Sequence, residues 1–188
     1  GQEIAVSGVI QAMFNDRRWP ALERALADAA NGDGAGLLAL HDSYFQRDRT
    51  TGSYPNLVES FQAITCADDP DRLSPDEADE RAEALAGVAP RLFPTDLGSY
   101  ACGSFPPAAD PRLEITGERA GPIVVIGTTG DPTTPIESSE AMADALDEGV
   151  FVTVEANRHT AYRTSDCIND IVHDQLIWLE PPPVGTVC

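Results

Sequence analysis

The sequence predicts an α/β fold in which a mostly helical region, residues 1–111, precedes part of a parallel β-sheet, residues 112–188. Two short apolar runs late in the chain predict neighbouring strands, and a segment of helical character joins them. Earlier in the chain, apolar residues recur at helical spacing between candidate helix caps. We therefore expect two domains, a helical cap or lid and a sheet domain.

The helical region contains four predicted helices. The first begins at Trp19-Pro20 and ends before Gly32, and the last begins with a capping box formed by Ser74 and Glu77. Apolar stripes of this kind are expected to pack in a core rather than to line a ligand groove. Residues 90–111, rich in Pro, Gly and Ser, are expected to lead back to the sheet. The stripes are Leu22, Ala25, Leu26 and Ala29; Leu37, Leu38 and Leu40; Leu57, Phe61 and Ile64; and Ala78, Ala82, Leu85 and Ala86.

The two predicted strands, Ile123–Ile126 and Val150–Val154, carry no charged residue. Their β-branched side chains are typical of strands buried on both faces of a parallel sheet. A parallel pair needs a crossover, and the intervening segment predicts a helix that starts with a Thr134/Glu137 capping box and ends at Gly149. A last helix is predicted from the apolar positions Ile168, Ile171, Val172, Leu176 and Leu179.

Asp131 and His159 are the candidate catalytic residues. Each follows one of the predicted strands, and loops at the carboxyl ends of parallel strands meet at one edge of a sheet. A histidine can accept the proton of a serine hydroxyl when a carboxylate holds the tautomer of its ring. Their order is that of the last two members of the Ser…Asp…His triad of α/β-hydrolases. Gly-Asp-Pro is also ordinary turn chemistry, so a purely structural turn is the alternative.

The nucleophile of such a triad is missing. No serine of the chain lies in a Gly-x-Ser-x-Gly motif, which is the nucleophile elbow of these enzymes. Ser104 follows Gly103, but Pro106 stands where the second glycine would be. We expect the serine in an upstream portion of the same precursor. The other histidines, His41 and His173, lie within helical patterns and are expected to be structural or solvated.

The stretches GPIVVIGTTGDPTTPIESSEAMADAL and NRHTAYRTSDCINDIV resemble the C-terminal region of tripeptidyl-aminopeptidase-like (TAP-like) α/β-hydrolases, secreted serine peptidases and esterases of actinobacteria. WPALERALADAANGDG and TGSYPNLVESFQAITCADDP resemble the helical cap region of the same family, so the resemblance covers nearly the whole chain. It implies that Asp131 is the family's acid and His159 its histidine. The chain departs from the family in lacking the serine and the oxyanion-hole segment.

The resemblance implies the C-terminal part of an α/β-hydrolase sheet that is incomplete without an upstream portion. Two strands fall short of the usual sheet of about five, so the others belong to a companion polypeptide or to a longer chain. The expected function is a serine exopeptidase that removes short peptides from substrate N-termini. A carboxylesterase with the same triad and a non-catalytic binding or structural module are the alternatives. The substrate is then a peptide or an ester, and this chemistry needs no metal or organic cofactor.

The acidic net charge of the chain argues against nucleic acid as a partner. The formal net charge is -19, from 31 acidic residues against 12 basic ones, all of them arginine. Such a surface repels phosphate backbones, so nucleic-acid binding is not expected. The sequence also contains no run of about 20 apolar residues, the length that a membrane span requires.

Four cysteines, Cys66, Cys102, Cys167 and Cys188, are widely spaced, which argues against a zinc site. An even number predicts disulfides and a secreted or cell-envelope protein. Three pairings are open. The last helix runs roughly 17 Å away from Cys167, and the tail can return roughly 27 Å when extended. This reach favours Cys167 with Cys188, which leaves Cys66 with Cys102.

Overall fold

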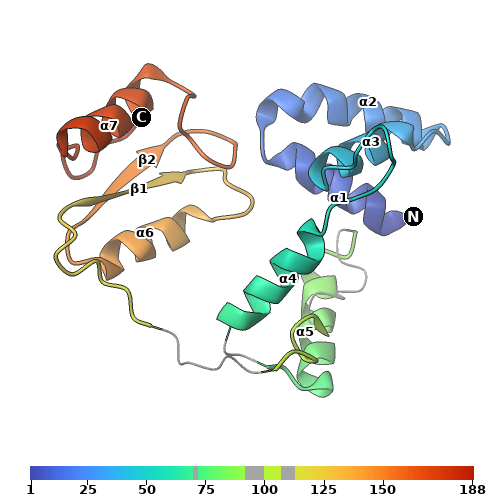
Figure 1. Ribbon diagram of the computed structural model, residues 1–188. Helices are drawn as coiled ribbons and strands as arrows, with labels where there is room; N and C mark the ends of the chain where they lie inside the picture. Colours follow the sequence, from blue (N-terminus) through green and yellow to red (C-terminus); the bar gives the residue numbers. More distant parts are fainter. Residues whose placement is uncertain (70–71, 92–99, 107–112) are drawn as a thin grey trace. The chain divides into compact units, whose positions relative to one another are not determined.

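The computed structural model describes residues 1–69, 72–91, 100–106 and 113–188 (Figure 1). They form two compact units, of which one combines Gly1–His41 with Glu114–Cys188 and the other comprises Asp42–Leu113. The end of the second unit lies near the predicted boundary at residue 111, whereas residues 1–41 group with the sheet. The assignment of residues 1–111 to a helical cap stays a prediction.

Two parallel strands, β1 (Ile123–Thr128) and β2 (Gly149–Val154), form the sheet of the first unit. Helix α6 (Ile136–Ala145) connects them on one side of the sheet, and helix α7 (Asp166–Trp178) lies on the other side (Figure 1). The predicted strands, crossover helix and last helix are therefore confirmed. In the part of the chain that the structure describes, the sheet has these two strands.

The ends of the crossover helix differ from the prediction. Pro135 is the N-cap of α6 without a side-chain cap, so the predicted capping box at Thr134 is wrong. The helix ends at Ala145, and Gly149 is the first residue of β2 rather than the helix terminus. A Cβ on Gly149 would lie 2.0 Å from the carbonyl oxygen of Ala143, so the glycine allows helix and strand to approach closely.

The C-terminal tail covers the outer edge of β2. The backbone N–H of Thr153 donates to the carbonyl of Thr186 (3.1 Å), and that of Cys188 donates to the carbonyl of Thr153 (2.8 Å). A disulfide between Cys167 and Cys188 fixes the tail to the start of α7, as predicted. This edge of the two-stranded sheet is therefore partly covered by the tail.

The core of the first unit lies between β2 and α7. Its buried members come from the strand, the loop that follows it and the helix, and they are Val152, Val154, Ala161 and Ile168. Ser165 caps α7, because its side chain accepts from the backbone N–H of Ile168. The loop that carries His159 is thus anchored at both of its ends.

The N-terminal part of this unit is helical. It contains α1 (Gln2–Met13), the short 3-10 helix η1 (Asp16–Arg18), α2 (Trp19–Ala30) and most of α3 (Ala35–Tyr44). The sequence predicted α2 and α3 but not α1, whose apolar residues form no clear stripe. Gly8 permits close packing of α1 on α3, since a Cβ there would lie 2.5 Å from the carbonyl oxygen of Leu37.

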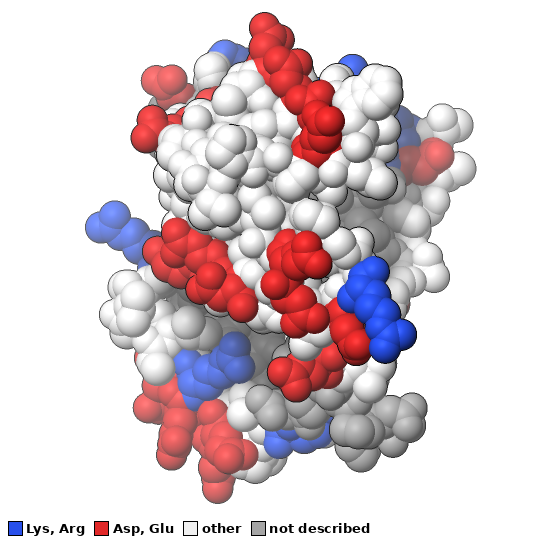
Figure 2. Space-filling view, turned by 90° about the vertical axis from the view of Figure 1, so that its left-hand side faces the viewer, with Lys and Arg blue, Asp and Glu red and all other residues white. Residues whose placement is uncertain are grey.

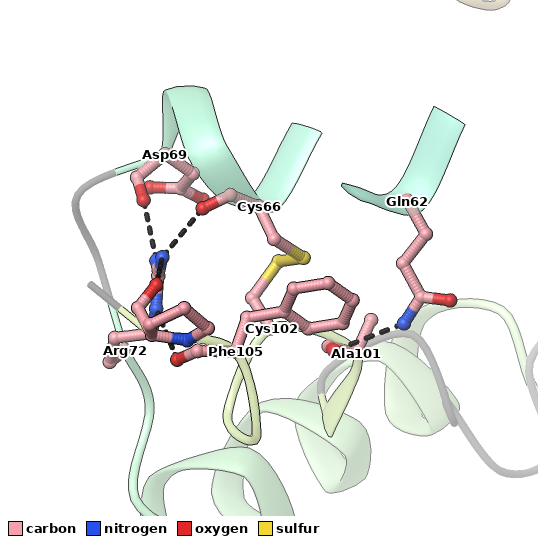
Figure 3. Close-up of a disulfide and its surroundings, with 8 residues drawn as sticks. Gln62, Cys66, Asp69, Arg72, Ala101, Cys102 and Phe105 are labelled. Atoms are coloured by element: carbon pink, nitrogen blue, oxygen red, sulfur yellow. Dashed lines mark hydrogen bonds between the residues drawn. A yellow bond between two sulfur atoms is a disulfide. The ribbon is translucent and has the colours of Figure 1, made fainter. Parts of the chain in front are cut away.

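The second unit is held by a disulfide and an arginine (Figure 3). It contains α4 (Leu57–Asp68) and α5 (Pro75–Val88), and Cys66 at the end of α4 is bonded to Cys102, as predicted. The guanidinium of Arg72 donates to the carbonyls of Cys66, Asp69 and Phe105. It therefore satisfies carbonyls that the end of α4 leaves without helical partners. The predicted capping box of Ser74 and Glu77 is confirmed at the start of α5.

The apolar stripes are buried only in part. Ala25, Leu37 and Ala78 are buried, whereas Phe61 and Ile64 on α4 are 70% and 62% exposed. The prediction that the stripes pack in a core is therefore wrong for α4.

Acidic side chains are spread over the face shown in Figure 2, among few arginines. Within the described ranges, none of the helices has the length and apolar character needed to cross a bilayer.

Candidate active site

The carboxyl ends of β1 and β2 bring the two candidate residues together. The backbone pairing of β1 with β2 continues past the end of β1. The N–H of Thr129 donates to the carbonyl of Val154 (3.0 Å), and the N–H of Gly130 donates to that of Ala156 (2.9 Å). The Asp131 turn and the His159 loop therefore run side by side. This is the convergence that the parallel arrangement predicts.

Gly130 is required for this close approach. A Cβ at this position would lie 2.4 Å from Oδ1 of Asn157, 3.0 Å from its Cα and 3.1 Å from the carbonyl oxygen of Ala156. Two of these three neighbours are backbone atoms and cannot rotate away. A larger residue would push the loop that carries His159 away from Asp131.

The imidazole of His159 is bonded to the carboxylate of Asp131. Nδ1 lies 2.9 Å from Oδ2 and 3.2 Å from Oδ1. Because an ionised carboxylate only accepts, Nδ1 carries the proton of this hydrogen bond, and Nε2 remains to accept a proton. The Asp131 side chain is 4% exposed and that of His159 is 35% exposed. The pair therefore consists of a buried carboxylate bonded to a partly exposed imidazole.

Asp131 also organises its own turn. Oδ1 accepts from the backbone N–H groups of Thr133 (2.8 Å) and Thr134 (3.0 Å), and Oδ2 accepts from the hydroxyl of Thr134 (2.8 Å). Burial by itself raises the pKa of the Asp131 carboxyl. The hydrogen bonds from Thr134, Thr133 and His159 outweigh burial and hold the pKa below its ordinary value of 3.8. The carboxylate is thus ionised at neutral pH.

Three residues that the sequence analysis missed support this pair. Thr134 was predicted as a helix cap but donates to Asp131 instead. Thr128 donates its hydroxyl to the carbonyl of Arg158, and the carbonyl of Phe14 accepts from the backbone N–H of His159 (2.9 Å). The only sequence signal for the role of Thr128 was its position as a polar residue at the end of a buried strand. Nothing local in the sequence relates Phe14 to His159.

The other histidines lie elsewhere. Nδ1 of His41 lies 2.6 Å from the hydroxyl of Ser7, and Nε2 of His173 lies 3.0 Å from that of Tyr162. Both belong to helices, as predicted, and neither contacts Asp131. Within residues 1–69, 72–91, 100–106 and 113–188, no serine is hydrogen-bonded to His159. Ser104 lies in the second unit, beside the disulfide of Cys102.

A pocket of about 680 Å³ lies beside the site. Arg158 lines it next to His159, but neither His159 nor Asp131 does. No group of three or more His, Cys, Asp or Glu side chains among the described residues is arranged to hold a metal ion. The pocket is lined by Asp16, Arg17, Trp19, Val154, Glu155, Ala156, Arg158, Thr164, Ser165, Cys167 and Cys188.

The C-terminal half of the chain carries both strands, Asp131 and His159. This half, residues 95–188, matches the sequence model of a family described as TAP-like protein. The chain belongs to the TAP-like family of α/β-hydrolases. Membership confirms the resemblance and the predicted fold class, and the two-stranded parallel sheet is part of an α/β-hydrolase fold.

The TAP-like chain is also similar to mycobacterial proteins over nearly its whole length. It is 32% identical to the serine protease Hip1 of Mycobacterium tuberculosis (strain ATCC 25618 / H37Rv) and 32% identical to carboxylesterase B of the same strain. Each alignment covers 98% of this chain and 36% of the other protein. The chain therefore spans little more than a third of the length of these relatives.

Proposed function

We propose that this chain is the C-terminal portion of a secreted or cell-envelope serine hydrolase. In this proposal, Asp131 orients His159, and a serine from an upstream portion of the same precursor attacks the carbonyl carbon of the substrate. His159 takes the serine proton through Nε2 and then returns a proton to the leaving group. The substrate class that we favour is a peptide from which the enzyme removes short N-terminal fragments.

The observation that carries the proposal is the hydrogen bond between Nδ1 of His159 and Oδ2 of Asp131, 2.9 Å long. A buried, ionised carboxylate behind a partly exposed imidazole is what a general base of this kind requires. Both residues lie in the loops after neighbouring parallel strands, where α/β-hydrolases carry their acid and histidine. The disulfides of Cys66 with Cys102 and of Cys167 with Cys188 fit an oxidising location.

The names of the relatives support two substrate classes. One relative is named a serine protease and another a carboxylesterase, at the same 32% identity. Both activities use one mechanism, acyl transfer to serine, and they differ in the leaving group, an amine or an alcohol. We keep the exopeptidase as the first candidate and the carboxylesterase as the second.

Substitution of the pair tests the mechanism. In the complete precursor-length enzyme, His159→Ala and Asp131→Asn should each lower kcat by several orders of magnitude, on the order of 10³ or more. His173→Ala is the matched control, because His173 lies in the same unit and is bonded to Tyr162 rather than to Asp131. Near-normal turnover by a folded His159→Ala enzyme would refute the role that we assign to this histidine.

The nucleophile is tested separately. A fluorophosphonate probe should label one serine of the complete enzyme, and peptide mapping should place this serine upstream of the present chain. Labelling should slow sharply in His159→Ala, because the probe reacts with an activated serine. A complete protein that neither reacts with the probe nor turns over any substrate is instead a binding or structural module.

A comparison of leaving groups separates the two substrate classes. An exopeptidase should hydrolyse peptidyl nitroanilides that have a free N-terminus. It should no longer hydrolyse them when the N-terminus is acetylated. Hydrolysis of short acyl esters without any peptide cleavage would establish the carboxylesterase instead. Both assays use the same enzyme preparation, so the ratio of kcat/KM values decides between them.

A further inference from the structure

The segment that joins α1 to η1 lies far from His159 in the sequence but contacts it in the fold. Phe14 closes α1, and Asn15 is extended, with φ of -157°. The side chain of Asn15 accepts from the backbone N–H of Arg17 (3.0 Å) and so caps η1. The two-residue segment is therefore held by a helix on each side.

This segment binds the backbone of the His159 loop. Asn15 and Arg158 form an antiparallel bridge, and the N–H of His159 donates to the carbonyl of Phe14 (2.9 Å). From the opposite element, β1, the hydroxyl of Thr128 donates to the carbonyl of Arg158. The peptide group between Arg158 and His159 is thus bonded at its oxygen to the sheet and at its nitrogen to the segment.

The side chain of Phe14 extends this support to the imidazole. The two ring centroids are 5.5 Å apart and the rings are inclined by 45°, which is within the range of favourable aromatic contacts. The His159 side chain is 35% exposed, and its ring is hydrogen-bonded to Asp131 along one edge, through Nδ1. A hydrogen bond at one edge does not by itself fix the side-chain torsions of a ring. Phe14 limits the rotation about them.

We infer that Phe14 is a positioning residue for His159. It acts through the imidazole rather than on the substrate, by keeping Nδ1 directed at Asp131 and Nε2 directed at the serine. The inference rests on the proposed function of His159 as general base. It also gives residues 1–41, which group with the sheet, a part in the reaction.

Three substitutions in the complete enzyme test the inference. Phe14→Leu and Phe14→Met keep an apolar side chain but remove the ring, and the methionine side chain is the more flexible of the two. Phe14→Tyr keeps the ring. We expect kcat to fall roughly 3- to 10-fold in the Leu and Met variants with KM little changed, and to stay near the original value in Phe14→Tyr. The rate of labelling by a small dialkyl fluorophosphonate should fall by the same factor, because this probe carries no peptide side chain for Phe14 to contact.

The outcomes separate a positioning role from other roles. Unchanged labelling with a raised KM would overturn the inference and make Phe14 a substrate contact. Unchanged kcat, KM and labelling in Phe14→Leu would overturn it as well. A lowered melting temperature with normal kcat in the folded fraction would show a merely structural role. If Phe14→Leu does not fold, the comparison of Phe14→Met with Phe14→Tyr distinguishes the positioning role of Phe14 from the other roles in the same way.

Failure of the proposed function is recognised independently. If the unsubstituted enzyme shows neither turnover nor labelling, or if the His159→Ala variant is fully active, then His159 is not the general base on which the inference rests. An active enzyme that His159→Ala inactivates, but that the Phe14 substitutions leave unchanged, would overturn the inference alone.

Discussion

The hydroxyl of Thr134 and the imidazole of His159 bond to the same oxygen of Asp131. Oγ1 of Thr134 lies 2.8 Å from Oδ2 and Nδ1 of His159 lies 2.9 Å from it, while Oγ1 and Nδ1 are 3.4 Å apart. The carboxylate therefore cannot rotate toward His159 or away from it without breaking its bond to Thr134. Together with the backbone N–H groups of Thr133 and Thr134, this hydroxyl sets the direction in which the carboxylate presents its charge.

Thr134→Val should lower kcat of the complete enzyme roughly 10-fold, with KM little changed. Valine keeps the branched shape of threonine but removes a hydrogen bond to a charged group, which typically contributes about 1.5–3 kcal/mol. Thr134→Ser keeps the hydroxyl and should retain most activity. Thr133→Val is the matched control, because Thr133 bonds to Asp131 through its backbone N–H. Equal kcat values for the Val and Ser variants at position 134 would contradict the prediction.

Gly130→Ala should separate the two loops of the site. The added Cβ would meet Asn157 and the carbonyl of Ala156 at 2.4 to 3.1 Å, so the backbone has to move. We expect a loss of about 1–3 kcal/mol in the free energy of unfolding, and a fall in kcat of about 10- to 100-fold from the misplaced imidazole.

Gly34→Ala is the control for Gly130→Ala, since a Cβ on Gly34 would meet no atom within 4 Å. Urea unfolding and steady-state kinetics measure the two effects. A Gly130→Ala enzyme as stable and as active as the Gly34→Ala enzyme would show that the loops do not need the glycine.

The sequence predicted the elements that are defined by short-range pattern. β1, β2, α2 and α5 follow from apolar runs, caps and breakers, and the parallel crossover then places Asp131 beside His159. Thr134 was misjudged because a threonine before Pro135 satisfies the rules for a helix cap, while its competing bond to Asp131 depends on the turn. Phe14 could not be predicted, since its contact with His159 joins residues that no local rule connects.

The stability of the enzyme should depend on Asp131 at acidic pH. Its pKa is below 3.8 in the folded protein, so ionised Asp131 stabilises the fold above the unfolded pKa. This stabilisation is lost as the pH falls through the lower, folded pKa. The difference in free energy of unfolding between the original enzyme and Asp131→Asn should therefore shrink as the pH falls below about 4.

Urea titrations at several pH values measure this difference. The pKa of Glu77 is also lowered, by its hydrogen bonds with Ser74, and that of Asp48 by the N–H groups of Thr51 and Thr50. Glu77 and Asp48 contribute equally to the stability of the original enzyme and of Asp131→Asn, so their contributions cancel when the two free energies of unfolding are subtracted. A difference that grows as the pH falls would contradict the assigned direction of the Asp131 pKa.

Removal of the disulfide between Cys167 and Cys188 should release the C-terminal tail from β2. A loop of this size contributes about 3 kcal/mol to the free energy of unfolding, so the Cys167→Ser/Cys188→Ser variant should be less stable by about this amount. Hydrogen exchange locates the change. The amides of Thr153 and Glu155 donate to the tail and should lose protection, whereas the paired Cys66→Ser/Cys102→Ser control should leave them protected.

The present chain by itself should show no serine-dependent turnover and no labelling by a fluorophosphonate probe. An imidazole and a carboxylate activate a serine but do not replace one, and no serine here lies in the elbow that exposes Oγ beside backbone donors. Ser104 follows a glycine, Gly103, but Cys102 and Pro106 stand where the two glycines of that motif would be. The measurement is intact-mass spectrometry of the chain after prolonged exposure to the probe, with the complete enzyme as positive control. Stoichiometric labelling that maps to Ser104 or to any other serine of this chain would show that the nucleophile does not lie upstream.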